Sequence, residues 1–278
     1  MGESADRVEC TMVVKLPEWL DNLIFGELKA KFCPQHSDMT NINDNKEETL
    51  NYLGTYFPRS YAESYCIFSE HFQTHGADFL GKEELSIFDF GCGTGGEIIG
   101  LLTALKKQFP NLKKTNIVAL DGNLYALRLY EKILNEFQKH AEIEINSKQA
   151  LIRIDDFYDL NILNQVMNKP FDIIISFKVI CEFATINQFK TQNPYEHLTK
   201  FMLKKLANKG LLLIEDVTSK NNTSQEWLPS MMDKGLNNIR CAIIAQNEGY
   251  NQTYTITHSH KINDVSKVAW RMIKTKIP

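Results

Sequence analysis

From residue 85 onward, short apolar runs alternate with longer stretches in which apolar residues recur at helical spacing. The run FDIIISF is continuously apolar, as expected for a parallel strand that is covered on both faces. The pattern predicts strands at residues 87–90, 116–120, 150–154, 171–177 and 210–215, and helices at residues 97–108, 124–140 and 195–206. Strands that alternate with helices in this way predict an α/β fold with a doubly wound, mostly parallel sheet.

The C-terminal part breaks this alternation, because three strand-like runs follow one another at residues 240–245, 253–257 and 267–273. A turn-like sequence separates the first two runs, and consecutive strands with short links are expected to pair antiparallel. We therefore expect an antiparallel C-terminal hairpin that closes one edge of a Rossmann-like, seven-stranded sheet.

The first 84 residues read as helical and carry no glycine motif. A helix is predicted from Pro17, a polar loop follows at residues 33–46, and two further helices are predicted at residues 47–57 and 59–74. In the last of these, the aromatic residues fall on one stripe, which indicates a core-facing surface. The predicted organisation is a helical N-terminal cap or lid at residues 1–84 and a larger domain at residues 85–278.

Composition narrows the range of functions. The chain has 278 residues and a net charge of −3, so no global basic surface would attract nucleic acid. Its six cysteines include no Cys-x-x-Cys pair, and Cys33 with His36 has no second pair at zinc-binding spacing, so we expect free thiols and no metal. No apolar run approaches the roughly 20 residues of a membrane helix. We expect a cytoplasmic protein without a membrane segment.

The clearest chemical motif follows the first predicted strand, where the sequence reads Asp89-Phe-Gly91-Cys-Gly93-Thr-Gly95. A glycine turn before a helix lets backbone approach a ligand and presents free N–H groups to it. Gly91-x-Gly93-x-x-Gly96 also fits the dinucleotide fingerprint, in which the helix faces a pyrophosphate. Asp89, however, would repel phosphates and attract an ammonium group.

With Asp89, the motif resembles motif I of the class I S-adenosylmethionine (SAM) methyltransferases. The resemblance covers about residues 85–275 and implies SAM as cofactor, with S-adenosylhomocysteine as product. It also implies that Asp89 lies near the cationic amino group of the methionine part, with Gly91, Gly93 and Gly95 beneath that part.

Other candidate residues follow the ends of later strands, because ligands of open α/β sheets lie outside the carboxyl ends of the strands. Asp121, followed by Gly122 and Asn123, is the candidate to accept the two ribose hydroxyls. The resemblance also implies that Asp156 or Asp155 accepts a hydrogen bond from the adenine amine and that Phe157 covers the adenine ring. The strand at residues 171–177 adds Ser176 and Phe177 as cofactor-site candidates.

Methyl transfer is an in-line displacement that needs alignment and exclusion of water more than acid–base groups. Glu182 is the candidate to orient or deprotonate the acceptor. Arg59, Tyr61 and Tyr65 precede the main domain, where the resemblance implies a lid over the cofactor, and Arg59 is the candidate to pair with the cofactor carboxylate or an anionic substrate. His258 and His260 share one face of a strand and are either surface residues or part of the substrate pocket.

Short phrases at residues 56–61, 176–183 and 213–216 are loosely similar to the methyltransferase family associated with the mitochondrial small ribosomal subunit, although that family's cysteine-rich metal segment is missing here. The function predicted from the sequence is SAM-dependent methyl transfer to an unidentified acceptor, with a small molecule or protein favoured over RNA. The alternatives are an NAD(P)-dependent oxidoreductase and a SAM-binding module without catalysis.

Overall fold

The computed structural model describes residues 13–34, 45–183, 190–220, 225–239, 241–246 and 252–275. Within these ranges the strands are β1 (Val13–Lys15), β2 (Glu84–Phe90), β3 (Lys114–Asp121), β4 (Glu144–Leu151), β5 (Phe171–Phe177), β6 (Leu206–Val217), β7 (Cys241–Gln246), β8 (Gln252–His258) and β9 (Lys261–Thr275). The helices are α1 (Glu18–Asp21), the π-helix η1 (Asn22–Glu27), α2 (Lys46–His75), the 3₁₀-helix η2 (Gly76–Phe79), α3 (Gly96–Gln108), α4 (Leu124–Ala141), the 3₁₀-helix η3 (Asn161–Gln165), α5 (Ile180–Phe183), α7 (Pro194–Leu203) and α8 (Leu228–Asn237).

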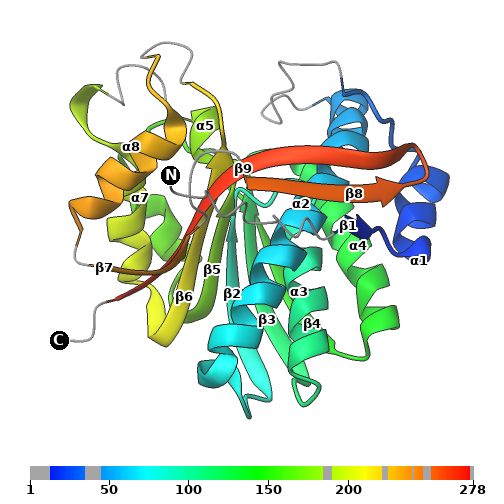
Figure 1. Cartoon of the computed structure of the whole chain (residues 1–278), viewed down its shortest axis with the longest axis horizontal. Helices are drawn as coiled ribbons and strands as arrows, with labels where there is room; N and C mark the ends of the chain where they lie inside the picture. Colours follow the sequence, from blue (N-terminus) through cyan, green and yellow to red (C-terminus); the bar gives the residue numbers. More distant parts are fainter. Residues whose placement is uncertain are drawn as a thin grey trace, which may run out of the picture.

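All of these strands belong to one sheet, with the order β1-β8-β9-β6-β5-β2-β3-β4 and with β7 also paired to β9. The five strands from β6 to β4 run parallel, whereas β9 pairs antiparallel with β6, β7 and β8. Helices α2, α3 and α4 cover one face of the parallel part, and α7 and α8 cover the other (Figure 1). The predicted fold class is therefore confirmed.

Two details of the sheet differ from the expectation. The described part of the chain forms nine strands rather than seven, in part because Val13–Lys15 extends the edge beside β8 in a region predicted to be helical. The antiparallel hairpin joins β8 to β9, whereas β7 pairs with β9 and not with β8 in the described residues. The length of β9 explains this, because its first half pairs with β8 and its last residues pair with β7 (Figure 1).

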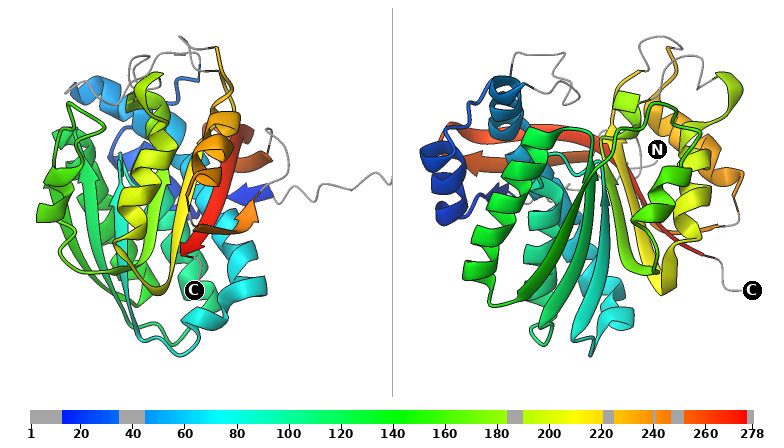
Figure 2. Two further views of the ribbon diagram at one scale, coloured as in Figure 1. Left: turned by 90° about the vertical axis from the view of Figure 1, so that its left-hand side faces the viewer. Right: turned by 180° about the vertical axis from the view of Figure 1, so that it is seen from behind.

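The prediction for strand β4 was wrong in position. The strand spans Glu144–Leu151 and lies at the far edge of the sheet (Figure 2), instead of at residues 150–154. Its side chains alternate between exposed and half-buried, so it lacks the continuous apolar run of a central strand. The acids at 155 and 156 consequently lie four and five residues beyond the strand end, not directly after it.

Helix α2 is one continuous helix, although a break was predicted near Pro58. It begins at Asn45, whose side chain accepts hydrogen bonds from the N–H groups of Glu47 and Glu48. A proline inside a helix removes one hydrogen bond and costs about 3 kcal/mol, which tertiary packing must offset.

That packing is a close contact between α2 and α3 across two glycines. A Cβ on Gly96 would lie 2.5 Å from the carbonyl oxygen of Phe57, and a Cβ on Gly100 would lie 2.4 Å from that of Tyr61. The backbones of the two helices therefore nearly touch, which places the first half of α2 beside the glycine turn. Residues of the N-terminal region and of the sheet share one core, and a lid role for residues 1–84 stays a prediction.

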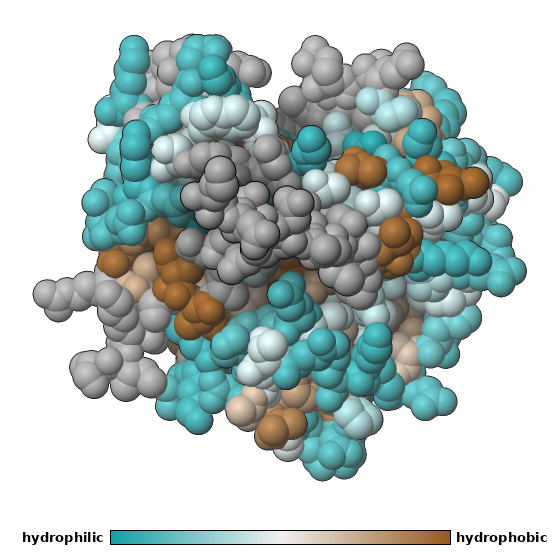
Figure 3. Space-filling model, viewed as in Figure 1, coloured by the Kyte–Doolittle hydropathy of each residue, from teal (hydrophilic) through white to brown (hydrophobic). Residues whose placement is uncertain are grey.

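The face seen in Figure 1 is mostly hydrophilic, with separate hydrophobic patches (Figure 3). In the part of the chain that the structure describes, no helix has the length and apolar character needed to cross a membrane.

Candidate active site

The glycine turn after β2 has the backbone conformation that its sequence predicts. Gly91, Gly93 and Gly95 have φ angles of +69°, +45° and +87°, which are left-handed and favour glycine. A Cβ on Gly91 would also lie 2.5 Å from Val179, and one on Gly95 would lie 2.7 Å from the ring of Tyr130. The turn thus needs glycine at these two positions because protein already fills the space around them.

Asp121, at the end of β3, is joined directly to this turn. Its carboxylate accepts the Gly93 N–H at 2.8 Å through one oxygen and the Asn123 N–H at 2.8 Å through the other. Burial raises the pKa of Asp121 to about 6, against the lowering effect of these backbone donors. Asp121 and the glycine turn therefore lie together at the carboxyl ends of β2 and β3, and a contact of Asp121 with ribose stays a prediction.

The neighbours of Asp121 have local structural roles. The Asn123 side chain caps α4 by accepting from Tyr125 N–H at 2.9 Å, and it donates to Thr49 Oγ1 of α2 at 3.2 Å. The Gly122 carbonyl accepts from Arg153 Nε at 3.3 Å. Contact of Gly122 or Asn123 with a cofactor stays a prediction.

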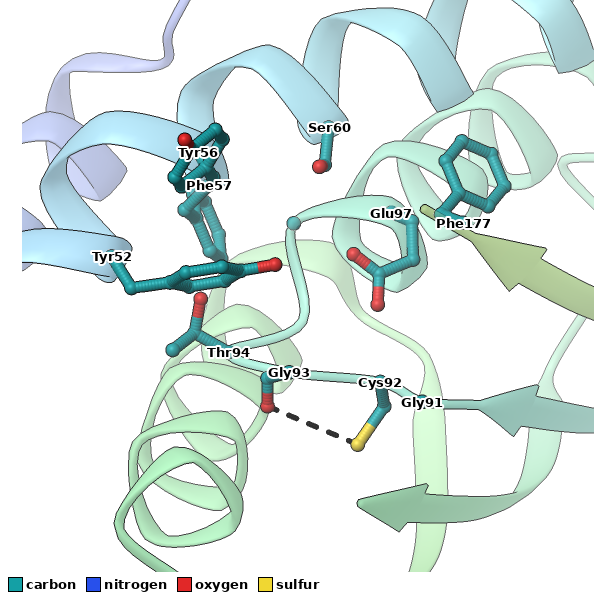
Figure 4. Close-up of a pocket in the computed structure, with 11 residues that line it drawn as sticks. Tyr52, Tyr56, Phe57, Ser60, Gly91, Cys92, Gly93, Thr94, Glu97 and Phe177 are labelled. Carbon is teal, nitrogen blue, oxygen red and sulfur yellow. Dashed lines mark hydrogen bonds between the residues drawn. The ribbon is translucent and has the colours of Figure 1, made fainter. Parts of the chain in front are cut away.

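A pocket lies between the glycine turn and α2. Its lining residues are Tyr52, Tyr56, Phe57 and Ser60 from α2, Gly91, Cys92, Gly93 and Thr94 from the turn, Gly96 and Glu97 from α3, and Phe177 from β5. In Figure 4 the Tyr52 hydroxyl and the Glu97 carboxyl both point into this space. The sequence analysis included the glycines and Phe177 but missed Tyr52, Tyr56, Ser60 and Glu97. The helical spacing of Tyr52, Tyr56 and Ser60 was the available signal for the α2 wall.

Two buried carboxyls behave differently around this turn. Asp89 is fully buried, neither of its oxygens has a hydrogen-bond partner, and it is not among the residues that line the pocket. Burial, followed by the charges of Glu97 and Asp121, raises the pKa of Asp89 well above its usual value. Glu97 is only 6% exposed and does line the pocket, whereas a contact of Asp89 with the cofactor stays a prediction.

Glu97 is also held partly neutral by its surroundings. Burial raises its pKa to about 8, while its own backbone N–H and the charge of Lys178 act in the opposite direction. At neutral pH this carboxyl can therefore change protonation state when a charged ligand arrives.

Lys178 follows β5 and sits in a buried cluster with acids from two other elements. It has a left-handed φ of +56°, and its ammonium group donates to Glu63 and, at 3.2 Å, to Ser60 Oγ. Its ammonium nitrogen also lies 3.7 Å from an oxygen of Glu215 at the end of β6. Burial opposes the charge, but the two glutamates raise the pKa of Lys178, so this cation stays committed to them.

Glu182, the predicted acceptor-binding residue, lies at the same end of the sheet. It is half-buried, and burial, followed by the charges of Asp121 and Asp216, raises its pKa to about 8. Its charge also raises the pKa of Tyr52, although burial is the larger cause. Glu182 is not among the residues that line the pocket, and its contact with an acceptor stays a prediction. Ser176 is buried, and its hydroxyl has no hydrogen-bond partner in the described part of the chain.

The predicted adenine site is only partly supported. Phe157 is 1% exposed and packs in the core beneath α7, so the prediction that its ring covers an adenine is wrong for this structure. Asp155 and Asp156 are exposed, and Asp156 accepts the Tyr158 N–H at 2.9 Å in a local turn. A contact of either acid with adenine stays a prediction.

Three residues predicted to form a lid have other partners. Tyr61 is buried in the core, and Tyr65 accepts from Lys107 near the far end of α3 at 3.0 Å, so neither reaches the glycine turn. Arg59 donates to both oxygens of Asp264 of β9 at 2.8 Å, which ties α2 to the sheet. The proposed lid role of these side chains is thus replaced by structural contacts.

His258 and His260 do not share a strand face as expected, because β8 ends at the buried His258 and the exposed His260 lies in the following turn, and neither lines the pocket. Both rings stack on Phe25 of η1, at centroid distances of 5.2 and 4.2 Å. Among the residues that the structure describes, no group of three or more possible metal ligands occurs. His36, of the rejected Cys33–His36 pair, lies outside the described residues.

Comparison with known proteins gives structural similarity only. No protein-family model and no curated protein matches the chain. An O-methyltransferase from Bacillus cereus, solved with SAH, is 10% identical with a TM-score of 0.47, and the match covers 94% of this chain and 92% of that one. The glycopeptide N-methyltransferase MtfA with sinefungin is 10% identical with a TM-score of 0.48, covering 92% and 97%.

A proposed rRNA methylase from Clostridium thermocellum is also 10% identical, with a TM-score of 0.46 and coverage of 77% of this chain and 96% of that one. Similarities this low do not establish what the present chain does, and its function is inferred below from its own site. The narrower resemblance to the mitochondrial ribosome-associated family stays a prediction.

Proposed function

We propose that this chain binds SAM and transfers its methyl group to an acceptor. The observation that carries the proposal is the position of three buried carboxyls, Asp89, Glu97 and Asp121, around a glycine turn at the start of α3. The start of a helix normally favours an anion, as in pyrophosphate-binding folds. Burial, and after it the charges of neighbouring acids, raises the pKa values of Asp89 and Glu97, so the added negative charge of a pyrophosphate is disfavoured here, whereas a sulfonium and an ammonium group are favoured.

The residues of the site fit the parts of SAM. The Asp121 carboxylate accepts from the backbone N–H groups of Gly93, Asn123 and Gly122, and because a carboxylate has about four lone-pair sites, capacity is left for a ribose hydroxyl. Glu97 lines the pocket and suits the ammonium group, while Asp89, buried just before the turn, has unused acceptor oxygens close by. Asp156 remains the candidate for the adenine amine.

When bound, SAM supplies a methyl group on a positively charged sulfur. The contribution of the chain is to align the acceptor with this group and to exclude water. Tyr52, Tyr56 and Phe57 form the α2 side of the pocket, and Phe177 lies opposite, so aromatic rings border the space from two elements (Figure 4). The acceptor is proposed to be a small molecule or protein, since the net charge of −3 gives RNA no general attraction.

Titration calorimetry on the full chain tests the proposal directly. We expect SAH to bind and NAD(P) not to bind, which separates the methyltransferase from the oxidoreductase. Asp121→Asn should weaken SAH about 10-fold or more, because a hydrogen bond to a charged group contributes about 1.5–3 kcal/mol. Glu131→Gln, an exposed change on α4, is the matched control and should bind SAH normally.

Two results would contradict the proposal. Tighter binding of NAD(P) than of SAH would favour the oxidoreductase, and equal SAH affinity in the Asp121 variant and its control would remove the assigned ribose site. If SAH bound but no acceptor led to production of SAH from SAM, the only remaining alternative would be the SAM-binding module without catalysis.

A further inference from the structure

Glu182 is a carboxyl that the proposed cofactor contacts leave unused. The Glu182 carboxyl accepts no hydrogen bond from any residue that the structure describes. Among the acids, Asp121 and Asp216 have the largest effects on its pKa. Asp216, by contrast, is fully engaged, because it accepts from the Tyr195 hydroxyl at 2.8 Å and from the N–H groups of Cys181 and Val217. Of these two acids, Glu182 is therefore the one whose carboxyl oxygens can still accept hydrogen bonds.

Two aromatic rings on α2 border the same region. Tyr52 and Tyr56 lie one helical turn apart, with ring centroids 4.8 Å apart, and both line the pocket. Glu182 lies beside this pocket, because its N–H donates to the carbonyl of Val179 at 3.1 Å and the Val179 side chain packs against Gly91 of the lining. The charge of Glu182 also raises the pKa values of Tyr52 and Tyr56, although burial is the larger cause. The Arg59 guanidinium lies 6.0 Å from the Tyr56 ring centroid, so this ring already has a cation beside it.

The lysine and the arginine near the pocket are already paired with acids. Lys178 is bound to Glu63, and Arg59 makes two hydrogen bonds to Asp264. The buried Glu97 carboxyl also points into the pocket (Figure 4), where it is assigned to the ammonium group of the cofactor. Acidic and aromatic groups with no available cation suit a positively charged acceptor and disfavour a phosphate or carboxylate.

We propose that the methyl acceptor is the nitrogen of a basic amine, held against Tyr52 and Tyr56, and that Glu182 takes its proton. This inference rests on the proposed function. The ammonium form of the acceptor first gives a proton to the Glu182 carboxylate. The nitrogen lone pair then forms the N–C bond as the C–S bond breaks, and that electron pair stays on sulfur, which becomes the neutral thioether of SAH.

The test uses the full chain with SAM and two amine probes, spermidine and a lysine-containing peptide, which distinguish a free amine from a protein side chain. The matched controls are the same probes with acetylated nitrogens, together with an oligoribonucleotide. We expect SAH production and one added methyl group on nitrogen, by mass spectrometry, with at least one amine probe and with none of the controls.

Variants assign the roles. Glu182→Gln should lower kcat about 100-fold while SAH affinity stays unchanged, because a positioned base contributes at least that factor. Tyr56→Ala should mainly raise KM for the amine. Circular dichroism checks that both variants fold, and Glu131→Gln again serves as the control.

The outcomes separate this inference from the proposed function. Absence of SAH binding would reject both. SAH binding with methylation of the oligoribonucleotide, with no methylation of either amine, or with full activity in Glu182→Gln would reject the amine inference alone.

Discussion

Two sets of buried carboxyls in this protein have opposite surroundings. Asp264 is 4% exposed and accepts two hydrogen bonds from Arg59, and despite burial, contacts from His258 and Arg59 lower its pKa. Asp89 and Glu97 are equally buried, yet they have other acids as neighbours and their pKa values are raised. Asp264 connects α2 to the sheet through Arg59, whereas Asp89 and Glu97 keep carboxyl oxygens that a ligand can use as hydrogen-bond acceptors. Burial alone therefore does not distinguish a structural acid from a functional one, but the partners do.

The largest expected effect concerns the glycine turn. Gly93→Arg should abolish SAH binding, with a loss of more than 100-fold or about 3 kcal/mol, because the new side chain enters the pocket from a left-handed backbone position. Gly81→Arg is the matched control, since Gly81 also has a positive φ of +78° but has open space around it. Calorimetry measures both affinities, and equal SAH binding by the two variants would remove the turn from the ligand site.

The structural acid is tested by removing its partner. Arg59→Met should lower the free energy of unfolding by about 3–5 kcal/mol, because Asp264 would remain buried without its counter-ion. Lys31→Met breaks an exposed ion pair with Glu47 and should leave stability nearly unchanged. Urea unfolding gives both values. If the two changes were equally mild, the Arg59–Asp264 pair would not have the structural role assigned to it.

The two sets should also respond to pH in opposite directions. The pKa of Asp121 is raised from 3.8 to about 6, so its ionised form is disfavoured in the folded state. Its contribution should lower the free energy of unfolding by up to about 3 kcal/mol as pH rises from about 4 to 6. The pKa of Asp264 is lowered, so its contribution is present at neutral pH and is lost as pH falls below 3.8.

Urea unfolding of the unliganded chain across this range measures the difference. Both chains should lose stability between pH 4 and 6, because the pKa values of Glu97 and Glu182 are raised as well, but the decrease should be smaller in Asp121→Asn than in the wild-type chain. A profile that is the same in both would mean that Asp121 titrates normally.

The smallest effect is expected at Asp89. Because burial, followed by the charges of Glu97 and Asp121, raises the pKa of Asp89 well above its usual value, the folded state disfavours the charged form, and Asp89→Asn should change the free energy of unfolding by less than about 1 kcal/mol. The comparison is Asp264→Asn, which removes a charged partner of Arg59 and should be clearly more destabilising. A large loss of stability at Asp89 would show that it belongs with the structural acids.

The sequence by itself determined the parallel core, the glycine turn and the place of Asp121. These features depend on local properties, namely apolar runs, backbone freedom at glycine and an acid directly after a strand. The position of β4 could not be predicted from such local properties, because an edge strand needs no continuous apolar run. The wrong end of this strand also led to the wrong role for Phe157.

Only the tertiary structure decided which side chains share the pocket. Tyr52 and Glu97 come from helices that meet because Gly96 and Gly100 allow their backbones to approach, and this contact also keeps α2 continuous through Pro58. Arg59 and Tyr65, on the same helix, point to other partners. Packing between distant segments fixes such directions, because one-residue steps along a helix turn side chains by about 100° toward different neighbours.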